Sequence, residues 1–227
     1  MTLEPLAAPQ TLTSHARTAV LSAIGDGRLE PGGLYSVAQL AEQLGVSRTP
    51  VREALLMLER EGRVRFERNR GVRVLAPTAH DIAEVFELRL LLEVPTTAAA
   101  AGRVDLDALT AAYDAMAEAA AAADEPAFMD RDERFHGVIL AATGNRRLVA
   151  AVAQLRDAVR GRGASTVGRS RDLPEILGEH QAILEALREG DGDRAAAAMR
   201  YHLRRTGDLL VAQEGSGGAQ EDQTGVV

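Results

Sequence analysis

The sequence of 227 residues contains no cysteine, no tryptophan and no lysine. Without cysteine the protein can form neither disulfide bonds nor thiolate metal sites, and a cysteine-free chain fits a reducing compartment. Aromatic residues make up only 3% of the chain, whereas 46% of it is hydrophobic. The core must therefore be built from aliphatic and alanine side chains, which favours closely packed helices over a β-sandwich.

Long apolar runs are also absent. Residues 1–20 lack the basic start and the following apolar run of a signal peptide. No stretch approaches the roughly 18–20 apolar residues that a membrane span needs. We therefore expect a cytoplasmic protein without a membrane partner.

The net charge of −7 taken over the whole chain argues against a nucleic-acid partner. The charges of the two parts of the chain, counted separately, give a different result. Residues 1–77 contain 10 Arg and 8 acidic residues, whereas residues 78–227 contain 16 Arg and 25 acidic residues. Between Arg48 and Arg73 there are 8 Arg against 4 acidic residues. The basic charge is thus concentrated in one short segment near the N-terminus.

The spacing of apolar residues predicts two kinds of organisation. Helices are expected over 11–25, 37–44 and 47–61, followed by alternating strands over 63–67 and 72–74 that close at Pro77. Beyond Pro77 only helical patterns follow, beginning at Thr78 with Asp81 as its capping partner. That helix should kink or break at Pro95. Further helices are expected over 105–123, 126–142, 146–162, 174–189 and 193–212.

This pattern predicts a mainly α protein with two domains. Residues 1–77 should form a winged helix-turn-helix, and residues 78–213 an all-helical bundle for effector binding and dimerisation. Residues 214–227 are rich in glycine, glutamine and serine and should form a disordered tail.

The segment from Leu40 to Leu55 contains the DNA-reading signal. Gly45 suits a tight turn between two short helices, Ser47 is a good N-cap, and Pro50 is tolerated in a first helical turn. The second helix therefore begins with polar and cationic groups, as a recognition helix in a major groove does.

Specific contacts can be assigned from this helix and from the hairpin that follows. Arg48 and Arg52 lie four residues apart, so both can reach bases or phosphates, while Ser47 and Thr49 would contact phosphates. The turn Asn69-Arg70-Gly71 would be the tip of a wing, with Arg70 and Gly71 at the neighbouring groove. The alternative is that these arginines form an ordinary solvated helix face.

Three histidines in the second domain lie within the apolar stripes of three different predicted helices: His136, His180 and His202. Asp132 precedes His136 by four residues, about 40° around a helix, so both can point at one object. Burying four polar groups without partners would cost several kcal/mol.

One bound cation would satisfy all four groups. Three imidazoles and one carboxylate suit Zn²⁺, Ni²⁺, Mn²⁺ or Fe²⁺. Two alternatives remain open from the residues alone: each histidine is an ordinary satisfied core residue, or the cluster binds a carboxylate directly without a metal. His15 and His80 lie outside the pattern.

The stretch from Gly45 to Leu55, with the hairpin over 63–74, resembles the winged-helix domain of GntR-type regulators. Members of the FadR-like branch often carry a charged residue shortly before the position of Leu40. Ser36, Val37 and Ala38 occupy that stretch here, so the resemblance implies no DNA contact from it.

Residues 78–212 resemble the all-helical (FCD-type) ligand domain of the same branch. The similarity rests on Phe135-His136, Gly144-Asn145, Glu179-His180, Gly190-Asp191 and His202. Metal-binding members use an Asp four residues before the first His and two later His, which implies metal ligation by Asp132, His136, His180 and His202. Such members bind small carboxylates beside the metal, and Arg89 is a candidate partner for one. Glu93 and Asn145 are further effector candidates that could equally be structural, Asn145 as a helix cap.

These features predict a transcription regulator and not an enzyme. A small carboxylate near the divalent metal would alter the pose of two winged helices, and a homodimer would bind a pseudo-palindromic double-stranded operator. The alternative, a metal-dependent hydrolase, would need an open coordination position and a placed general base. No His-Glu-x-x-His or comparable element occurs.

Overall fold

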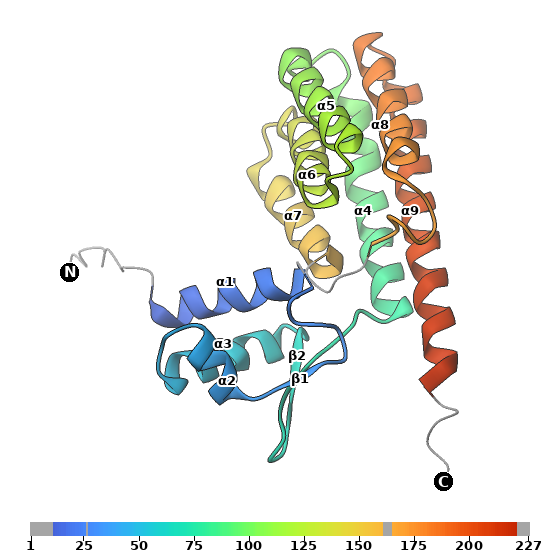
Figure 1. Ribbon diagram of the computed structural model, residues 1–227. Helices are drawn as coiled ribbons and strands as arrows, with labels where there is room; N and C mark the ends of the chain where they lie inside the picture. The colour runs from blue at the N-terminus through green and yellow to red at the C-terminus, as the bar shows by residue number, and fades with distance from the viewer. Residues whose placement is uncertain (1–10, 26, 161–164, 222–227) are drawn as a thin grey trace, which may run out of the picture. The chain divides into compact units, whose positions relative to one another are not determined.

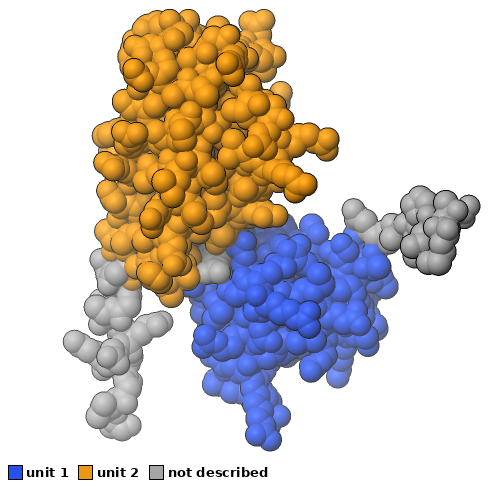
Figure 2. All heavy atoms as spheres, turned by 180° about the vertical axis from the view of Figure 1, so that it is seen from behind, with its two compact units in different colours: residues 1–76, 160–163 blue, residues 77–159, 164–227 orange. Residues whose placement is uncertain are grey.

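The computed structural model describes residues 11–25, 27–160 and 165–221. The chain divides into two compact units, with the division between Ala76 and Pro77 (Figure 2). Each unit has its own core of mainly aliphatic side chains.

The first unit is a winged helix-turn-helix. It contains α1 (Leu12–Gly25), β1 (Leu34–Tyr35), α2 (Val37–Gln43), α3 (Arg48–Arg60), β2 (Val64–Glu67) and β3 (Gly71–Val74). The three strands pair antiparallel in the order β1-β3-β2. The three helices and the hairpin predicted from the sequence are confirmed. Strand β1 was missed, because two residues are too short to display an alternating pattern.

Helix α3 carries the core of this unit. Its buried face consists of Val51, Ala54, Leu55 and Leu58, and it packs against α1, α2 and β2. Ser36 begins α2 with a reciprocal capping box to Gln39. The opposite face of α3 is therefore left to solvent.

The second unit is built from helices: α4 (Ala79–Ala100), α5 (Leu106–Ala121), α6 (Glu125–Ala141), α7 (Arg146–Arg160), α8 (Leu173–Arg188) and α9 (Gly192–Glu221). Helices α4, α8 and α9 lie side by side, and α5 packs on α6 and α8 (Figure 1). Thr78 and Asp81 form the expected capping box at the start of α4. The predicted fold class, a winged helix-turn-helix followed by an all-α domain, is confirmed.

Two local expectations differ from the structure in part. Helix α4 continues through Pro95, so the break offered as one outcome there does not occur. Pro95 is exposed, so the carbonyl that loses its intrahelical donor lies on the solvent side, where water can replace that donor. Helix α9 extends to Glu221, past the start of the expected tail at 214, because extending an existing helix costs far less than starting one. Residues 222–227 of that tail lie outside the described residues.

Among the described residues, no helix combines the length and the apolar character that crossing a membrane requires.

Candidate metal centre and nucleic-acid interface

The residues predicted to contact DNA lie on the exposed start of α3. Ser47, Arg48, Thr49 and Arg52 are all exposed, whereas Val51 beneath them is fully buried. Ser47 occupies the N-cap position, but its side chain makes no capping hydrogen bond within the described residues. The positive end of α3 is thus surrounded by polar and cationic side chains that can contact phosphates.

The Arg52 side chain contacts an aromatic ring of the wing. Its guanidinium lies 5.5 Å from the centre of the Phe66 ring in β2, within range of a cation–π interaction. Sequence reasoning missed this contact because Phe66 belongs to a different element.

The wing turn has the geometry expected of its residues. Asn69 adopts a φ of 61° and Gly71 a φ of 129°. A Cβ atom on Gly71 would lie 2.3 Å from the carbonyl oxygen of Tyr35, so glycine allows β1 and β3 to approach. Arg70 forms an ion pair of 3.1 Å with Glu67, yet 65% of its side chain remains exposed. Arg70 can therefore reach a partner at the tip.

In the second unit the structure brings four predicted side chains together. Asp132 and His136 come from α6, His180 from α8 and His202 from α9, and all four are buried. Each offers one donor atom, and these four atoms lie within 4.8 Å of one another. The residues are far apart in sequence, so the bundle assembles the cluster.

Each imidazole of the cluster is oriented through its Nδ1 atom. His136 Nδ1 lies 2.5 Å from the Glu93 carboxylate, His180 Nδ1 lies 2.8 Å from the Ile176 carbonyl oxygen, and His202 Nδ1 lies 2.8 Å from the Glu179 carboxylate. These oxygens accept, so Nδ1 is the nitrogen that donates in each ring. The Nε2 atoms of His136 and His202 are then left with lone pairs, as in metal-bound histidines. His180 Nε2 lies 2.8 Å from the Asp132 carboxylate, so a metal bound there would take the place of a proton.

The Asp132 carboxylate lies close to the Nε2 atoms of two of these histidines. Its Oδ2 atom pairs with the Arg156 guanidinium, while its Oδ1 atom lies 2.8 Å from His180 Nε2 and 3.9 Å from His136 Nε2. The two Nε2 atoms are 3.4 Å apart. His180 Nε2 therefore donates to Asp132 Oδ1 when it is protonated, and a cation could replace that proton and bind all four converging atoms.

The donor set fits such an ion. Imidazole nitrogens and carboxylate oxygens bind divalent transition metals at about 2.0–2.2 Å, so donors on opposite sides of one ion lie roughly 4 Å apart. The four donor atoms lie within 4.8 Å of one another, which is close to this spacing. With no cysteine in the chain, the donors do not distinguish Zn²⁺, Ni²⁺, Mn²⁺ and Fe²⁺.

The electrostatics favour ligand-ready protonation states. Burial, reinforced by the nearby Arg156, lowers the pKa of His136 to about 4. Burial and then His180 and His136 keep the pKa of His202 well below its usual value. Burial alone would raise the pKa of Asp132, but Arg156 and His180 hold it well below its ordinary range. Neutral imidazoles and an ionised carboxylate are the forms that bind metals.

Two arginines adjoin the cluster, Arg89 buried and Arg156 largely buried. Arg89 Nε donates to Glu93 over 2.7 Å, and Arg156 pairs with Asp132. Within the described residues, Arg89 Nη2 and Arg156 Nη1 are buried and have no hydrogen-bond partner. Buried donors of this kind are rare and costly.

Sequence reasoning identified Arg89 but missed Arg156. The missed signal was the one that identified the histidines: Arg156 lies in the apolar stripe of α7 with Val149, Val152 and Val159. A polar residue within an apolar stripe is as informative for arginine as for histidine.

The other two effector candidates already have partners within the helical unit. Both carboxylate oxygens of Glu93 are engaged, one by Arg89 and one by His136. Asn145 is exposed, and its Oδ1 atom accepts from the backbone N–H groups of Arg147 and Leu148 at the start of α7. The structure thus supports the capping alternative for Asn145.

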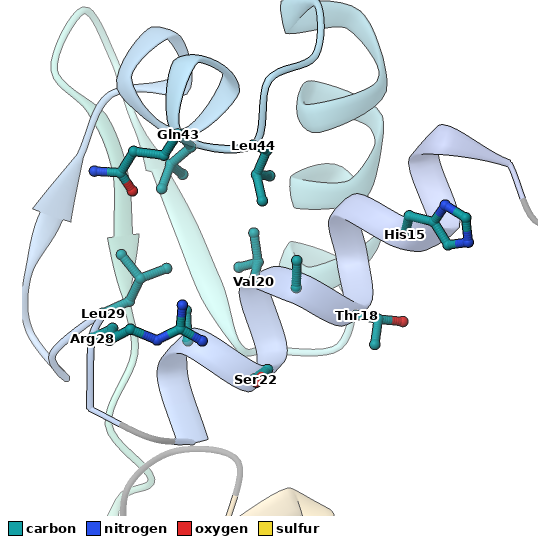
Figure 3. A pocket seen from close by; sticks show the side chains of 11 residues that line it. His15, Thr18, Val20, Ser22, Arg28, Leu29, Gln43 and Leu44 are labelled. Atoms are coloured by element: carbon teal, nitrogen blue, oxygen red, sulfur yellow. The ribbon is translucent and has the colours of Figure 1, made fainter.

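A separate cavity of about 520 Å³ lies in the first unit. Residues of α1, α2 and the chain after α1 line it, with Val20, Leu29, Leu40 and Leu44 as apolar surfaces (Figure 3). It contains none of the predicted DNA-contacting or metal-ligating residues.

Comparisons with known proteins match both units. Residues 12–74 match the family of bacterial regulatory proteins called the gntR family, and residues 84–205 match the FCD domain. The relatives and structural neighbours are transcriptional regulators, not enzymes.

Individual relatives span most of the chain. A probable D-xylose utilization operon transcriptional repressor from Paenarthrobacter nicotinovorans is 30% identical over 197 residues, covering 85% of this chain and 86% of its own. A gluconate operon transcriptional repressor from Bacillus licheniformis is 26% identical and covers 91% and 92%. The crystal structure of a putative transcriptional regulator GntR from Rhodococcus sp. RHA1 superposes with a TM-score of 0.75 at 26% identity, covering 88% of this chain and 97% of the other.

Proposed function

The chain belongs to the GntR family of bacterial regulatory proteins and carries an FCD domain, and we propose that a small carboxylate metabolite, bound beside a divalent metal in the helical unit, controls its affinity for operator DNA. The domain assignment is part of this proposal: residues 1–77 bind DNA, and residues 78–213 bind the metal and the effector and form the dimer.

The observation that carries the effector proposal is the pair of buried N–H donors on Arg89 and Arg156. Beside them, two guanidinium charges are balanced by the carboxylates of Glu93 and Asp132. A divalent cation among the histidines would leave an excess of two positive charges in a buried site. A carboxylate effector supplies both the compensating charge and the acceptors that the two donors need.

The metal has two roles in this proposal, as the ion bound by four side chains and as a binding partner of the effector. Asp132, His136, His180 and His202 would hold it, and when bound it supplies a positive centre that attracts a carboxylate oxygen. The arginines orient the anion and the buried walls exclude water. An effector controls DNA affinity only if it binds the two poses of the winged helices with different affinity.

On the DNA side, Arg48 and Arg52 would read base edges or phosphates, Ser47 and Thr49 would contact phosphates, and Arg70 and Gly71 would meet the adjacent groove. A homodimer would match a pseudo-palindromic operator. In α4 the apolar side chains of Leu88 and Leu91 are 47% and 65% exposed. They lie three residues apart on one helical face, which suits a contact with the second copy.

The proposal is tested with one operator, identified by footprinting the protein on genomic DNA. Fluorescence anisotropy then measures operator affinity against a panel of mono-, di- and tricarboxylates. We expect Arg52→Ala to lose operator binding by at least about tenfold with the fold intact. Arg60→Ala, at the far end of the same helix, is the matched control and should bind nearly normally. Equal binding by both variants would exclude the recognition-helix assignment.

The effector half is tested on the same assay. Arg89→Lys keeps the charge that Glu93 requires but loses the planar fork with its unpartnered Nη2 donor. It should bind the operator without effector as the unaltered protein does, and respond only at higher carboxylate concentration. Arg147→Lys, an exposed change on α7, should respond normally. An unchanged response of Arg89→Lys, or no response of the unaltered protein to any carboxylate, would contradict the effector site.

A further inference from the structure

The segment that joins α7 to α8 contains a buried arginine that the metal centre does not use directly. Only 2% of the Arg171 side chain is exposed. Its Nη1 atom donates to both carboxylate oxygens of Glu179, over 2.8 and 2.7 Å. Its Nε atom donates to the Thr166 hydroxyl over 3.0 Å, and its Nη2 atom to the Thr206 hydroxyl over 2.6 Å. All three guanidinium nitrogens are thus engaged, which fixes the side chain.

The same Glu179 carboxylate orients one histidine of the cluster. Its Oε2 atom accepts from His202 Nδ1 over 2.8 Å. The His202 ring centre then lies 4.4 Å from that of His180 and 5.3 Å from that of His136. Thr206 contributes a second restraint, because its hydroxyl donates to the His202 carbonyl oxygen over 2.8 Å. Arg171 therefore holds both groups that restrain His202.

The serines of the segment from Ser165 to Arg171 anchor it to two helices. Ser165 donates to Glu125 at the start of α6 over 2.6 Å, and Ser170 accepts from Gln213 of α9 over 2.6 Å. Within the segment, the backbone N–H groups of Ser170 and Arg171 both donate to the Thr166 carbonyl oxygen. Arg171 consequently links the segment 165–171 to His202 through Glu179.

We propose that Arg171 is a positioning residue for the metal centre, acting through Glu179 on His202, so that metal binding and the conformation of residues 165–171 are coupled. The inference rests on the metal site of the proposed function. Holding Nδ1 of His202 on a carboxylate keeps Nε2 unprotonated and aimed at the ion, as outer-shell carboxylates do at histidine–metal sites. Because coupling is reciprocal, a bound metal must also stabilise the connection.

Arg205 provides the matched control. It also contacts Glu179, with Nη1 lying 3.2 Å from Oε1, but its side chain is 33% exposed and its other guanidinium contacts are to Glu175 and Tyr201. It carries the same charge to the same carboxylate without linking to residues 165–171. If arginine acted on Glu179 only through its charge, substitution of Arg171 and of Arg205 would weaken metal binding equally. The proposed route through residues 165–171 predicts that only substitution of Arg171 weakens it.

The test compares Arg171→Lys with Arg205→Lys in the full-length protein. Zinc affinity is measured by chelator competition, at a temperature where circular dichroism shows both variants folded. Arg171→Lys should bind zinc about 10–100-fold more weakly, the usual effect of losing an outer-shell partner. Arg205→Lys should stay within about twofold. Thr206→Val, which preserves every charge, should lose about fivefold, the value of one net hydrogen bond.

Two further readouts separate positioning from a merely structural role. The visible spectrum of the cobalt-loaded protein should change in Arg171→Lys and not in Arg205→Lys. Zinc should slow hydrogen exchange in the peptide covering residues 165–171, and Arg171→Lys should lose that protection. If Arg171→Lys lowers the melting temperature but leaves zinc affinity and the cobalt spectrum unchanged, the inference is wrong while the metal site stands. If the unaltered protein binds no zinc, nickel, manganese or iron, the metal proposal itself fails, and the inference with it.

Discussion

Removing the metal should weaken the helical unit in particular. A cation would bind Asp132 Oδ1 and the Nε2 atoms of three histidines whose Nδ1 atoms contact Glu93, Ile176 and Glu179. Without it, His180 Nε2 still contacts Asp132 Oδ1 over 2.8 Å, but no ion joins the donor atoms of α6, α8 and α9. The perturbation is chelation of the purified protein, followed by reloading with a single metal.

The size of the effect follows from the free energy of metal binding. A ligand at a thousand times its Kd stabilises a protein by about 4 kcal/mol. For a chain of this size each kcal/mol shifts the melting temperature by about 2–4 °C. We therefore expect stripping to lower the transition of the helical unit by roughly 8–16 °C.

Differential scanning calorimetry with elemental analysis of each sample measures this shift. The winged-helix unit contains none of the four residues, so its transition provides an internal reference that should not move. His80→Ala is the matched histidine control, since His80 is 81% exposed and pairs only with Glu84 among the described residues. It should shift on stripping as the unaltered protein does. Identical transitions for stripped and reloaded protein, with the metal content verified, would refute the reasoning that the cluster is built around a cation.

Other expected outcomes concern glycine positions and the wing. Gly207→Ala gains about 1 kcal/mol of helix propensity, but its Cβ would lie 2.8 Å from the Phe86 ring, so overpacking of about 1–3 kcal/mol should prevail in urea denaturation. Gly178→Ala, where the new methyl enters open space, should instead stabilise α8 by about 1 kcal/mol, and the same sign for both would contradict this assignment. Gly71→Ala should destabilise by about 1–3 kcal/mol or more and weaken operator binding, because it adds a collision with the Tyr35 carbonyl to the strained φ; a loss no larger than that of Gly45→Ala, whose position is open, would argue against the close approach of β1 and β3. Phe66→Leu removes the ring beneath Arg52 and should weaken operator binding by about two- to fivefold in fluorescence anisotropy, the value of an exposed cation–π contact; full affinity would mean that Arg52 needs no support from the wing.

The sequence was most informative where the determining interactions are local. Helix starts such as that at Thr78 depend on a partner three residues away, and the apolar stripes depend on neighbours within two turns. The same stripes predicted that His136, His180 and His202 are buried, because a helix face decides burial whatever the rest of the fold is. Arg156 carried the same signal and was overlooked in favour of histidine.

Which buried groups meet one another depends on tertiary packing. Glu93 contacts His136 across 43 residues, and Glu179 contacts His202 across 23, so no local pattern specifies either pairing. The burial of Arg171 in a connecting segment was equally unforeseeable, since irregular segments have no periodicity from which burial can be read. The winged helix-turn-helix and the identities of the four candidate ligands were determined by the sequence. The orientation of each imidazole, and the burial of the Arg89 and Arg156 donors without partners among the described residues, follow from helix packing, because the bundle as a whole sets the contacts between distant elements.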